Sequence, residues 1–170
     1  MKIGIIGLGD MGKLYALKFA ASGMEVCGCD LPEREEELRS ELAPSGIQVL
    51  SDGRAVSAAS DLIFYAVEAE KIEHVVAFCA LSTRQGAIVT GMTSVKTPEV
   101  AAFEKFLPKD TELLITHSLH GPGFSTKGQK LIVAPHRISA GNYQKALAVL
   151  GKLESEIIEL EDFHQHDKIM

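Results

Sequence analysis

The sequence predicts an α/β fold in which helices cover both faces of a doubly wound, mainly parallel sheet. Three observations support this fold class. Short apolar runs alternate with amphipathic segments along all 170 residues, which is the pattern of repeated βαβ units. The apolar runs are nearly continuous, as in Leu62–Val67, which is typical of strands covered on both faces. A glycine-rich turn directly follows the first run and opens the first amphipathic segment.

The first half of the chain is expected to hold four strands and four helical segments. Each strand is a short apolar run, and the first helix follows from apolar residues such as Leu14 and Leu17 on one side of a polar segment. The strands are Lys2–Gly7, Glu25–Asp30, Ile47–Leu50 and Asp61–Val67. The helical segments are Asp10–Ser22, the highly charged Glu33–Ala43, a turn at Ala55–Ser60, and Glu68–Leu81.

The second half continues the alternation, with one polar loop, His120–Gln129, between two neighbouring strands. The expected strands are Ala87–Met92, Glu112–His117, Lys130–Pro135 and Glu156–Leu160. The expected helices are Pro98–Leu107 and Asn142–Ser155. We expect residues 1–161 to form one domain. Residues 162–170 look like the start of a helix that lacks a terminating signal, so we expect this segment to lead into a second domain that is absent here.

Composition and charge exclude several classes of protein. The hydrophobic share of 46% and the charged share of 24% are ordinary for a soluble domain. A net charge of -6 argues against non-specific nucleic-acid binding. No apolar run approaches the roughly 20 residues of a membrane span, and the N-terminus has no signal-peptide pattern. We therefore expect a cytoplasmic protein that binds neither nucleic acid nor membrane.

The three cysteines predict neither a redox pair nor a metal site. Cys27 and Cys29 are two residues apart in an apolar strand, and Cys79 lies in a helical stretch. This is not a C-x-x-C motif, and the histidine spacings match no zinc pattern. We expect small buried apolar side chains and no bound metal.

The sharpest motif is the glycine-rich turn after the first strand. In its full context of strand, turn and helix, this pattern is typical of a Rossmann domain that binds a dinucleotide. The first glycine permits a tight turn, the second lets the backbone approach the pyrophosphate, and the third lets helix and strand pack closely. The free N–H groups at the helix start then bind the phosphates. The alternative is a turn without a ligand. The motif residues are Gly7, Leu8, Gly9, Asp10, Met11 and Gly12.

The end of the second strand bears on the choice between NAD and NADP. Asp30 lies where an acidic residue binds the adenosine ribose, which favours NAD because a carboxylate repels a 2′-phosphate. Arg34 is four residues further on and could pair with that phosphate. The alternatives are a helix N-cap for Asp30 and a solvated helix face for Arg34. From these residues alone, the choice of cofactor stays open.

Further polar groups follow other strands at the same carboxyl edge. Val67 and Glu68 follow the fourth strand, and we expect their backbone to line the nicotinamide ribose unless this is an ordinary βα turn. Thr93-Ser94-Val95-Lys96 and the segment from His117 to Pro122 follow two later strands. The topology is expected to bring both loops close to the nicotinamide.

Four segments together resemble the prephenate/arogenate dehydrogenase family, in particular its fungal type: GLGDMG at 7–12, TSVK at 93–96, HSLHGP at 117–122 and HDK at 166–168. The resemblance covers nearly the whole chain. It implies oxidative decarboxylation of prephenate or arogenate, with hydride transfer to NAD(P)+, in tyrosine biosynthesis. It also implies a homodimer, formed through an all-helical second domain. The fungal relatives use NADP, which raises the expectation of NADP despite Asp30.

The resemblance also assigns roles to individual residues. His117 is expected to accept a hydrogen bond from the ring hydroxyl of the substrate, and Ser94 to assist at the same hydroxyl. The sequence departs from the commoner family pattern at Thr93 and Ser118, where glycine and proline are frequent, although the fungal relatives share both departures. The alternatives are a locally bonded strand-end histidine for His117 and a helix N-cap for Ser94.

The other candidates are weaker. Lys96 is expected either to meet a substrate carboxylate or to solvate its loop, and His120 either to border the substrate or to be an ordinary loop residue. His166 and Asp167 match a segment that in the family begins the connecting helix near the active site, and a role for them is expected only with that helix complete. His136 and Arg137 follow a strand and could face the cleft, but we expect them at the surface.

Two other functions compete with this interpretation. One is a β-hydroxyacid-type dehydrogenase, which shares the GLGxMG start but has a different substrate loop. The other is a non-catalytic module that senses NAD(P) redox state. For the prephenate/arogenate dehydrogenase interpretation, the missing helical domain implies that residues 1–170 bind cofactor but turn over poorly or not at all on their own.

Overall fold

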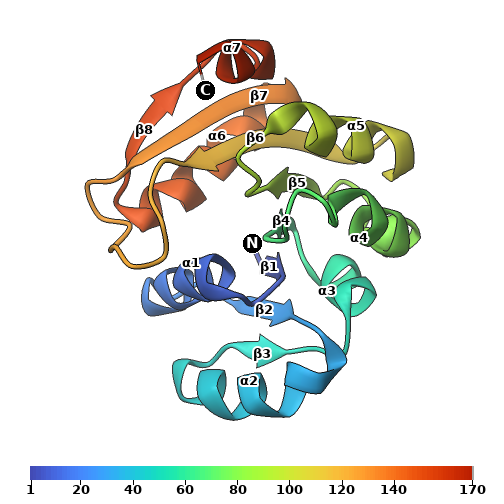
Figure 1. The fold of residues 1–170 in the computed structure, drawn as a ribbon, viewed down its shortest axis with the longest axis vertical. Coiled ribbons are helices and arrows are strands. Elements are labelled where there is room, and N and C mark those ends of the chain that lie inside the picture. The colour runs from blue at the N-terminus through green and yellow to red at the C-terminus, as the bar shows by residue number, and fades with distance from the viewer. Residues whose placement is uncertain (170) are drawn as a thin grey trace.

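The computed structural model describes residues 1–169, which fold into eight strands, seven α-helices and four short 3-10 helices (Figure 1). The strands are β1 Ile3–Ile6, β2 Val26–Cys29, β3 Gln48–Val49, β4 Leu62–Tyr65, β5 Ile88–Gly91, β6 Glu112–Ser118, β7 Lys130–Arg137 and β8 Glu156–Glu159. The helices are α1 Asp10–Ala21, α2 Glu35–Leu42, α3 Gly53–Ala59, α4 Ile72–Cys79, α5 Lys96–Phe106, α6 Ala140–Leu150 and α7 Phe163–Ile169. Met170, the last residue of the expected terminal helix, lies outside the described residues.

All eight strands form one sheet in the order β3-β2-β1-β4-β5-β6-β7-β8. Neighbouring strands are parallel, except that β6 and β7 form an antiparallel pair. The order reverses between β1 and β4, and in open α/β sheets ligands bind at such a switch point. The predicted doubly wound, mainly parallel sheet is therefore confirmed.

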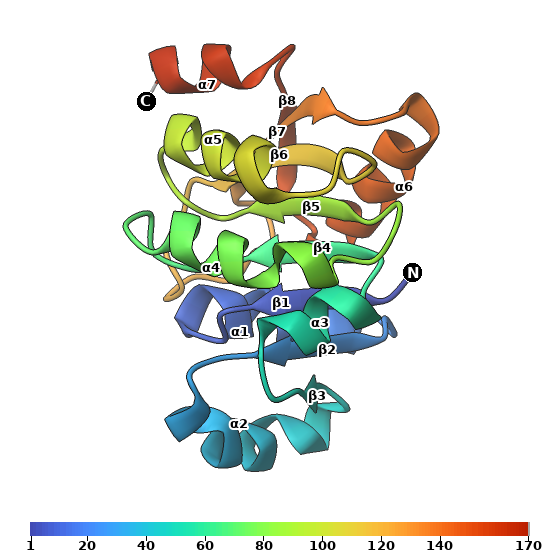
Figure 2. The same cartoon turned by 90° about the vertical axis from the view of Figure 1, so that its right-hand side faces the viewer.

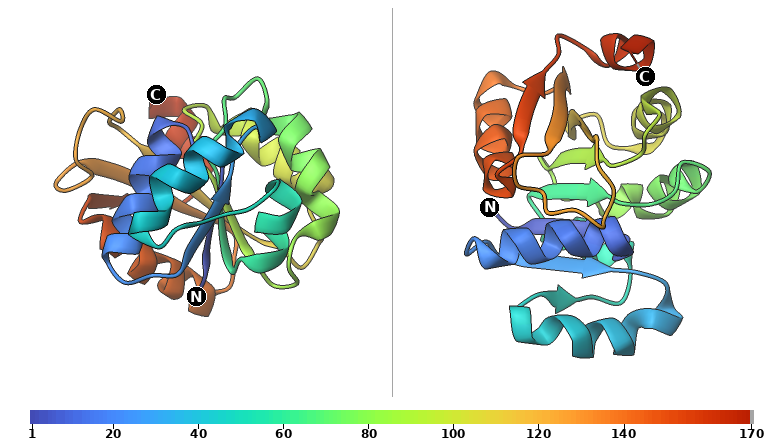
Figure 3. Two further views of the ribbon diagram at one scale, coloured as in Figure 1. Left: turned by 90° about the horizontal axis from the view of Figure 1, so that it is seen from below. Right: turned by 60° about the vertical axis from the view of Figure 1, so that its left-hand side comes forward.

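Helices cover both faces of the sheet. In Figure 1, α1 and α6 lie on one side of the strands, and α3, α4 and α5 lie on the other. Figure 2 shows the strands stacked along the long axis, with α2 and α7 at opposite ends. The view from below in Figure 3 separates α1 and α2 from α3 and α4 across the strands. Both faces of the central strands are thus buried, which explains their continuous apolar sequence.

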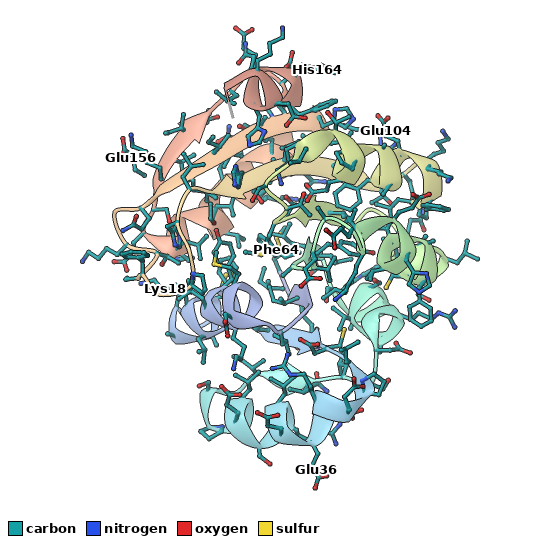
Figure 4. The ribbon with its side chains drawn as sticks, viewed as in Figure 1. Lys18, Glu36, Phe64, Glu104, Glu156 and His164 are labelled. Carbon is teal, nitrogen blue, oxygen red and sulfur yellow. The ribbon has the colours of Figure 1, made fainter. Side chains whose placement is uncertain are left out.

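Alternate residues of β4 contribute to the two cores. Phe64, at the centre of Figure 4, packs with Tyr15 and Phe19 of α1, and the ring centroids are 5.6–6.0 Å apart. Tyr65 faces the other side and packs against Phe103 of α5 at 5.5 Å. Burying an aromatic side chain of this kind stabilises the fold by about 1.5–3 kcal/mol.

Helices α2 to α6 each begin two to four residues away from the predicted start, and the contacts at two of these starts are clear. α5 begins at Lys96 rather than Pro98, because the side chain of Asp167 accepts the first N–H groups of the helix. α4 begins at Ile72 rather than Glu68, because the N–H of Lys71 bonds the carbonyl of Glu68 and closes a separate turn. The helix-forming regions were predicted, but these starts depend on contacts that the local sequence does not reveal.

The two edge strands differ in length and composition. β3 contains two residues, whereas β8 has four and carries an exposed glutamate at each end, Glu156 and Glu159. Each edge strand pairs with one neighbour, β3 with β2 and β8 with β7. Among the helices of residues 1–169, none has the length and apolar character that crossing a bilayer requires.

Candidate active site at the carboxyl edge of the sheet

The turn after β1 requires glycine at two positions for different reasons. Gly7 has a φ of +102°, and a Cβ there would lie 2.3 Å from the carbonyl oxygen of Ala66. A Cβ on Gly12 would lie 1.9 Å from the carbonyl oxygen of Gly7, so only glycine lets α1 approach β1 this closely. A Cβ on Gly9 would meet open space. The turn therefore leaves an open cradle beside Gly9, which fits the approach of a pyrophosphate.

A pocket of about 590 Å³ opens beside this cradle, at the switch point of the sheet. Its lining includes six of the residues predicted to bind the cofactor: Gly7, Gly9, Asp30, Arg34, Val67 and Glu68. The side chain of Leu8 instead lies in the hydrophobic core and is fully buried. Only the backbone of Leu8 is therefore available to contact a bound cofactor.

Asp30 and Arg34 contact each other at the rim of this pocket. The guanidinium of Arg34 donates to the Asp30 carboxylate at 2.9 Å, and the carboxylate also accepts the N–H of Leu31 at 2.8 Å. Asp30 does not cap the helical turn that follows, so that alternative is wrong. Arg34 is half-buried rather than fully solvated. Glu68 is exposed and pairs with Lys71 at 2.8 Å.

The loop between β5 and α5 carries Ser94, and the buried carboxylate of Glu99 holds this loop through hydrogen bonds. Glu99 accepts the backbone N–H of Thr93 at 3.0 Å and its hydroxyl at 2.6 Å. Ser94 itself is exposed. The N-cap of α5 is Val95, without a side-chain cap, so the N-cap alternative for Ser94 is wrong. Its hydroxyl is therefore not committed to capping this helix.

Lys96 lies beneath the same loop and is fully buried. Its ammonium donates to Glu99 at 2.9 Å and to the carbonyl of Gly91 at 3.1 Å. Burial lowers the pKa of the ammonium, and the neighbouring Glu99 carboxylate opposes that change. The alternative that Lys96 solvates the loop is wrong. Its predicted contact with a substrate carboxylate stays a prediction, since the ammonium is held here by the protein itself.

His117 lies near the carboxyl end of β6 and is 5% exposed. Its Nδ1 lies 2.8 Å from Nε2 of His166, a residue 49 positions further along the chain. The pKa of His117 is lowered to about 4, chiefly by burial and then by the positive charge of Lys96. His117 is therefore a neutral imidazole at neutral pH, and its partner is not local.

The terminal helix α7 supplies that partner together with a carboxylate. Nδ1 of His166 lies 2.8 Å from the carboxylate of Asp167. The same carboxylate accepts the backbone N–H groups of Lys96 and Thr97, at 3.2 and 3.0 Å, and the Thr97 hydroxyl at 2.5 Å. Burial opposes ionisation of Asp167, but these bonds outweigh it and bring its pKa to about 2. A role for His166 and Asp167 was expected only with the connecting helix complete, yet both already contact the candidate site.

The residues next to His117 are held in different ways. Ser118 hydrogen-bonds the hydroxyl of Tyr15, which is buried on α1. Burial raises the pKa of Tyr15 to about 12, against a smaller opposing effect of that hydrogen bond. His120 has Nδ1 3.0 Å from the carbonyl oxygen of Gly121. The contacts of Tyr15 and Glu99 with the site were not predicted from the sequence. At helical spacing, Tyr15 looks like an ordinary core residue, and Glu99 looks like a solvated one.

The topology brings the two catalytic candidates to the same edge as the glycine turn. β1, β4, β5 and β6 are parallel, so Ser94 after β5 and His117 near the end of β6 both lie at the carboxyl edge. Within residues 1–169, no group of three or more histidine, cysteine, aspartate or glutamate side chains is arranged to bind a metal ion. The fold and this edge define a Rossmann-type oxidoreductase domain.

Comparisons with known proteins agree with that class. A family model described as NADP oxidoreductase coenzyme F420-dependent matches residues 2–93. A protein of Schizosaccharomyces pombe named probable prephenate dehydrogenase (NADP(+)) is 43% identical over 168 residues, which cover 99% of this chain and 39% of that protein. A protein of Saccharomyces cerevisiae named prephenate dehydrogenase (NADP(+)) is 44% identical, covering 98% of this chain and 37% of that protein.

A solved structure shows the same architecture. The prephenate dehydrogenase of Aquifex aeolicus has a TM-score of 0.80 at 19% identity, and the match covers 98% of this chain and 63% of that one. The chain belongs to the NADP oxidoreductase coenzyme F420-dependent family. Its predicted resemblance to the fungal-type prephenate dehydrogenases is confirmed. The chain spans about two fifths of the length of these curated relatives.

Proposed function

We propose that this chain is the cofactor-binding part of a prephenate dehydrogenase that uses NADP+. The observation that carries the proposal is His117, a buried neutral imidazole at the carboxyl edge that also holds the glycine turn and the Ser94 loop. The names of the two fungal relatives, at 43% and 44% identity, support the substrate and the cofactor. Arogenate is the alternative substrate, because its ring carries the same hydroxyl and carboxylate.

The pocket beside the glycine turn would hold the dinucleotide. The backbone at Gly9 and the start of α1 would bind the pyrophosphate, as helix N-termini bind anions. At the rim, Asp30 would face the adenosine ribose, and Arg34 offers a guanidinium for a 2′-phosphate. When bound, the nicotinamide ring accepts the hydride that the substrate loses.

His117 and Ser94 would act on the ring hydroxyl of prephenate. A neutral imidazole has one nitrogen with a free lone pair, which can accept a hydrogen bond from the C4 hydroxyl. Drawing electron density toward that oxygen promotes loss of hydride from C4. Loss of carbon dioxide from C1 then makes the ring aromatic and drives the reaction forward. Ser94, exposed on its loop, would orient the hydroxyl.

For the complete protein we propose a cytoplasmic homodimer. The fungal-type resemblance implies a helical second domain that forms the dimer and supplies further contacts to the substrate. The chain alone would bind NADP+ and turn over poorly, since those contacts come from beyond it.

Turnover by the complete protein tests the proposal. Prephenate and arogenate are each supplied with NADP+ or NAD+, and formation of the reduced cofactor is followed by absorbance. Replacing His117 by asparagine is expected to lower kcat by roughly 10²–10⁴-fold while the Kd for NADP+ stays unchanged. The matched control is His136→Asn, which alters a histidine paired with Glu104. Cofactor binding with no oxidation of either substrate would refute the proposal and favour a redox-sensing module.

A further inference from the structure

The contacts of Asp167 determine where the protons of two histidines lie. An ionised carboxylate only accepts hydrogen bonds, so the Nδ1 of His166 that faces Asp167 at 2.8 Å must carry a proton. The carboxylate is held ionised by donors from Lys96 and Thr97 at the start of α5. This anion lies at the N-terminus of an eleven-residue helix, where the helix dipole also favours negative charge.

His166 in turn determines which nitrogen of His117 carries a proton. A neutral imidazole with its proton on Nδ1 has a lone pair on Nε2. That Nε2 lies 2.8 Å from Nδ1 of His117, so the His117 nitrogen is the donor and carries a proton. A neutral His117 with its proton on Nδ1 leaves its Nε2 free, and Nε2 is then the lone pair available to an incoming hydroxyl.

We propose that His166 and Asp167 are positioning residues that hold His117 in the Nδ1–H tautomer and so present its Nε2 as the proton acceptor of the active site. This inference deepens the proposed dehydrogenase function and rests on it. His166 is fully buried and its ring meets that of His117 edge to face, with centroids 4.9 Å apart, so the orientation of both rings is fixed by packing as well as by hydrogen bonds.

The proton balance of the reaction fits this arrangement. As hydride leaves C4 of the substrate, Nε2 of His117 takes up the hydroxyl proton, and the resulting positive charge is stabilised through His166 by the Asp167 carboxylate. After carbon dioxide leaves C1, the proton returns to the phenolate oxygen. In total the substrate loses one hydride and one carbon dioxide. The hydroxyl proton returns to the product, so no net proton is released.

His166 and Asp167 also connect the Ser94 loop with strand β6. Asp167 bonds the first N–H groups of α5, directly after the loop that carries Ser94, while His166 bonds His117 on β6. α7 therefore fixes the two catalytic candidates relative to each other. Its residues are about 50–70 positions away from these partners in sequence, and the contact exists because α7 folds back over α5 and β7.

The test uses the complete protein with four variants. His166→Leu removes the acceptor for Nδ1 of His117, whereas His166→Gln retains a side-chain oxygen near the position of Nε2. Asp167→Asn removes the charge but keeps the shape. His164→Leu is the control, because His164 lies on the same helix but is exposed (Figure 4). Turnover of prephenate, the Kd for NADP+ and the ¹⁵N NMR shifts of the labelled imidazoles are measured for each.

We expect wild-type His117 to show a protonated Nδ1 and an unprotonated Nε2. His166→Leu and Asp167→Asn are expected to lower kcat by roughly 10–100-fold, the usual effect of losing an orienting partner, with KM and the Kd for NADP+ within about twofold of wild type. His166→Gln is expected to restore most of kcat, and His164→Leu to leave it unchanged. A merely structural helix contact would not give rescue by glutamine.

Two results would overturn the inference: a proton on Nε2 of His117 in the wild-type protein, or a normal kcat in His166→Leu. If a variant fails to fold, the NMR tautomer of the wild-type protein still decides. If the wild-type protein shows the Nδ1–H tautomer but oxidises neither prephenate nor arogenate, then the proposed function fails while the hydrogen-bond assignment stands.

Discussion

Replacing Lys96 by methionine should destabilise the domain strongly, although no substrate or cofactor is involved. Methionine fills a similar volume but provides no ammonium. In the wild-type domain, the Lys96 ammonium lies 2.9 Å from the carboxylate of Glu99, and both side chains are fully buried. The carboxylate would keep its bonds from Thr93 and lose its charge partner. Removing one member of a buried ion pair costs about 3–5 kcal/mol, because a charge remains out of contact with water.

The double variant Lys96→Met/Glu99→Gln gives the decisive comparison. The amide of glutamine is uncharged and can still accept the N–H of Thr93, so we expect the double variant to lie within about 1–2 kcal/mol of wild type. The single variant would then be less stable than the double one. For a domain of this size, a loss of 3–5 kcal/mol corresponds to a fall in Tm of about 6–20 °C.

Urea unfolding followed by circular dichroism measures these free energies. The control is Lys105→Met, which breaks an ion pair with Glu73 in which both side chains are more than 60% exposed, and we expect a loss below about 1 kcal/mol there. A loss of that small size in Lys96→Met, or a double variant less stable than the single one, would refute the reasoning about an uncompensated charge.

Three further predictions follow from the site. Gly9→Val is expected to weaken NADP+ binding at least about tenfold with little change in stability, because its side chain enters the open cradle, whereas Gly12→Ala is expected to unfold the domain at lower urea, because its Cβ meets backbone at 1.9 Å. The pKa of His117 is about 4 when folded and 6.5 when unfolded, so the unfolded state binds more protons between these values. The unfolding free energy should therefore fall by roughly 3 kcal/mol as the pH drops through that interval, and His117→Gln should remove this part of the slope. Arg34→Ala should raise the Kd for NADP+ by roughly tenfold or more and leave that for NAD+ nearly unchanged; an equal change for both cofactors, measured by titration, would contradict a role at the 2′-phosphate.

The sequence was enough to predict the fold class and the edge of the sheet that carries the site. Alternation of apolar runs with amphipathic segments follows from burial on both faces, and the glycine turn has steric requirements that are local to the motif. The loops that carry His117 and Ser94 could be singled out because polar groups after strands of a parallel sheet share one edge. The choice of these two residues came from the resemblance to the prephenate/arogenate dehydrogenase family.

What the sequence did not reveal depends on contacts between distant segments. The spacing of Lys96 and Glu99 looks like a solvated pair on a helix, and only the packing of α5 on the sheet buries it. The contact of His166 with His117 exists because the terminal helix folds back toward β6. The antiparallel pairing of β6 with β7 was likewise not assigned from the sequence.

The two margins of the sheet bear on how the protein associates. A strand with unpaired backbone groups invites a second chain to add to it, and proteins guard against this with short or charged border strands. β3 offers two residues, and β8 is flanked by Glu156 and Glu159, whose like charges would repel the same strand of another copy. Strand addition between copies is therefore disfavoured at both margins, and the domain should resist fibril growth at high concentration.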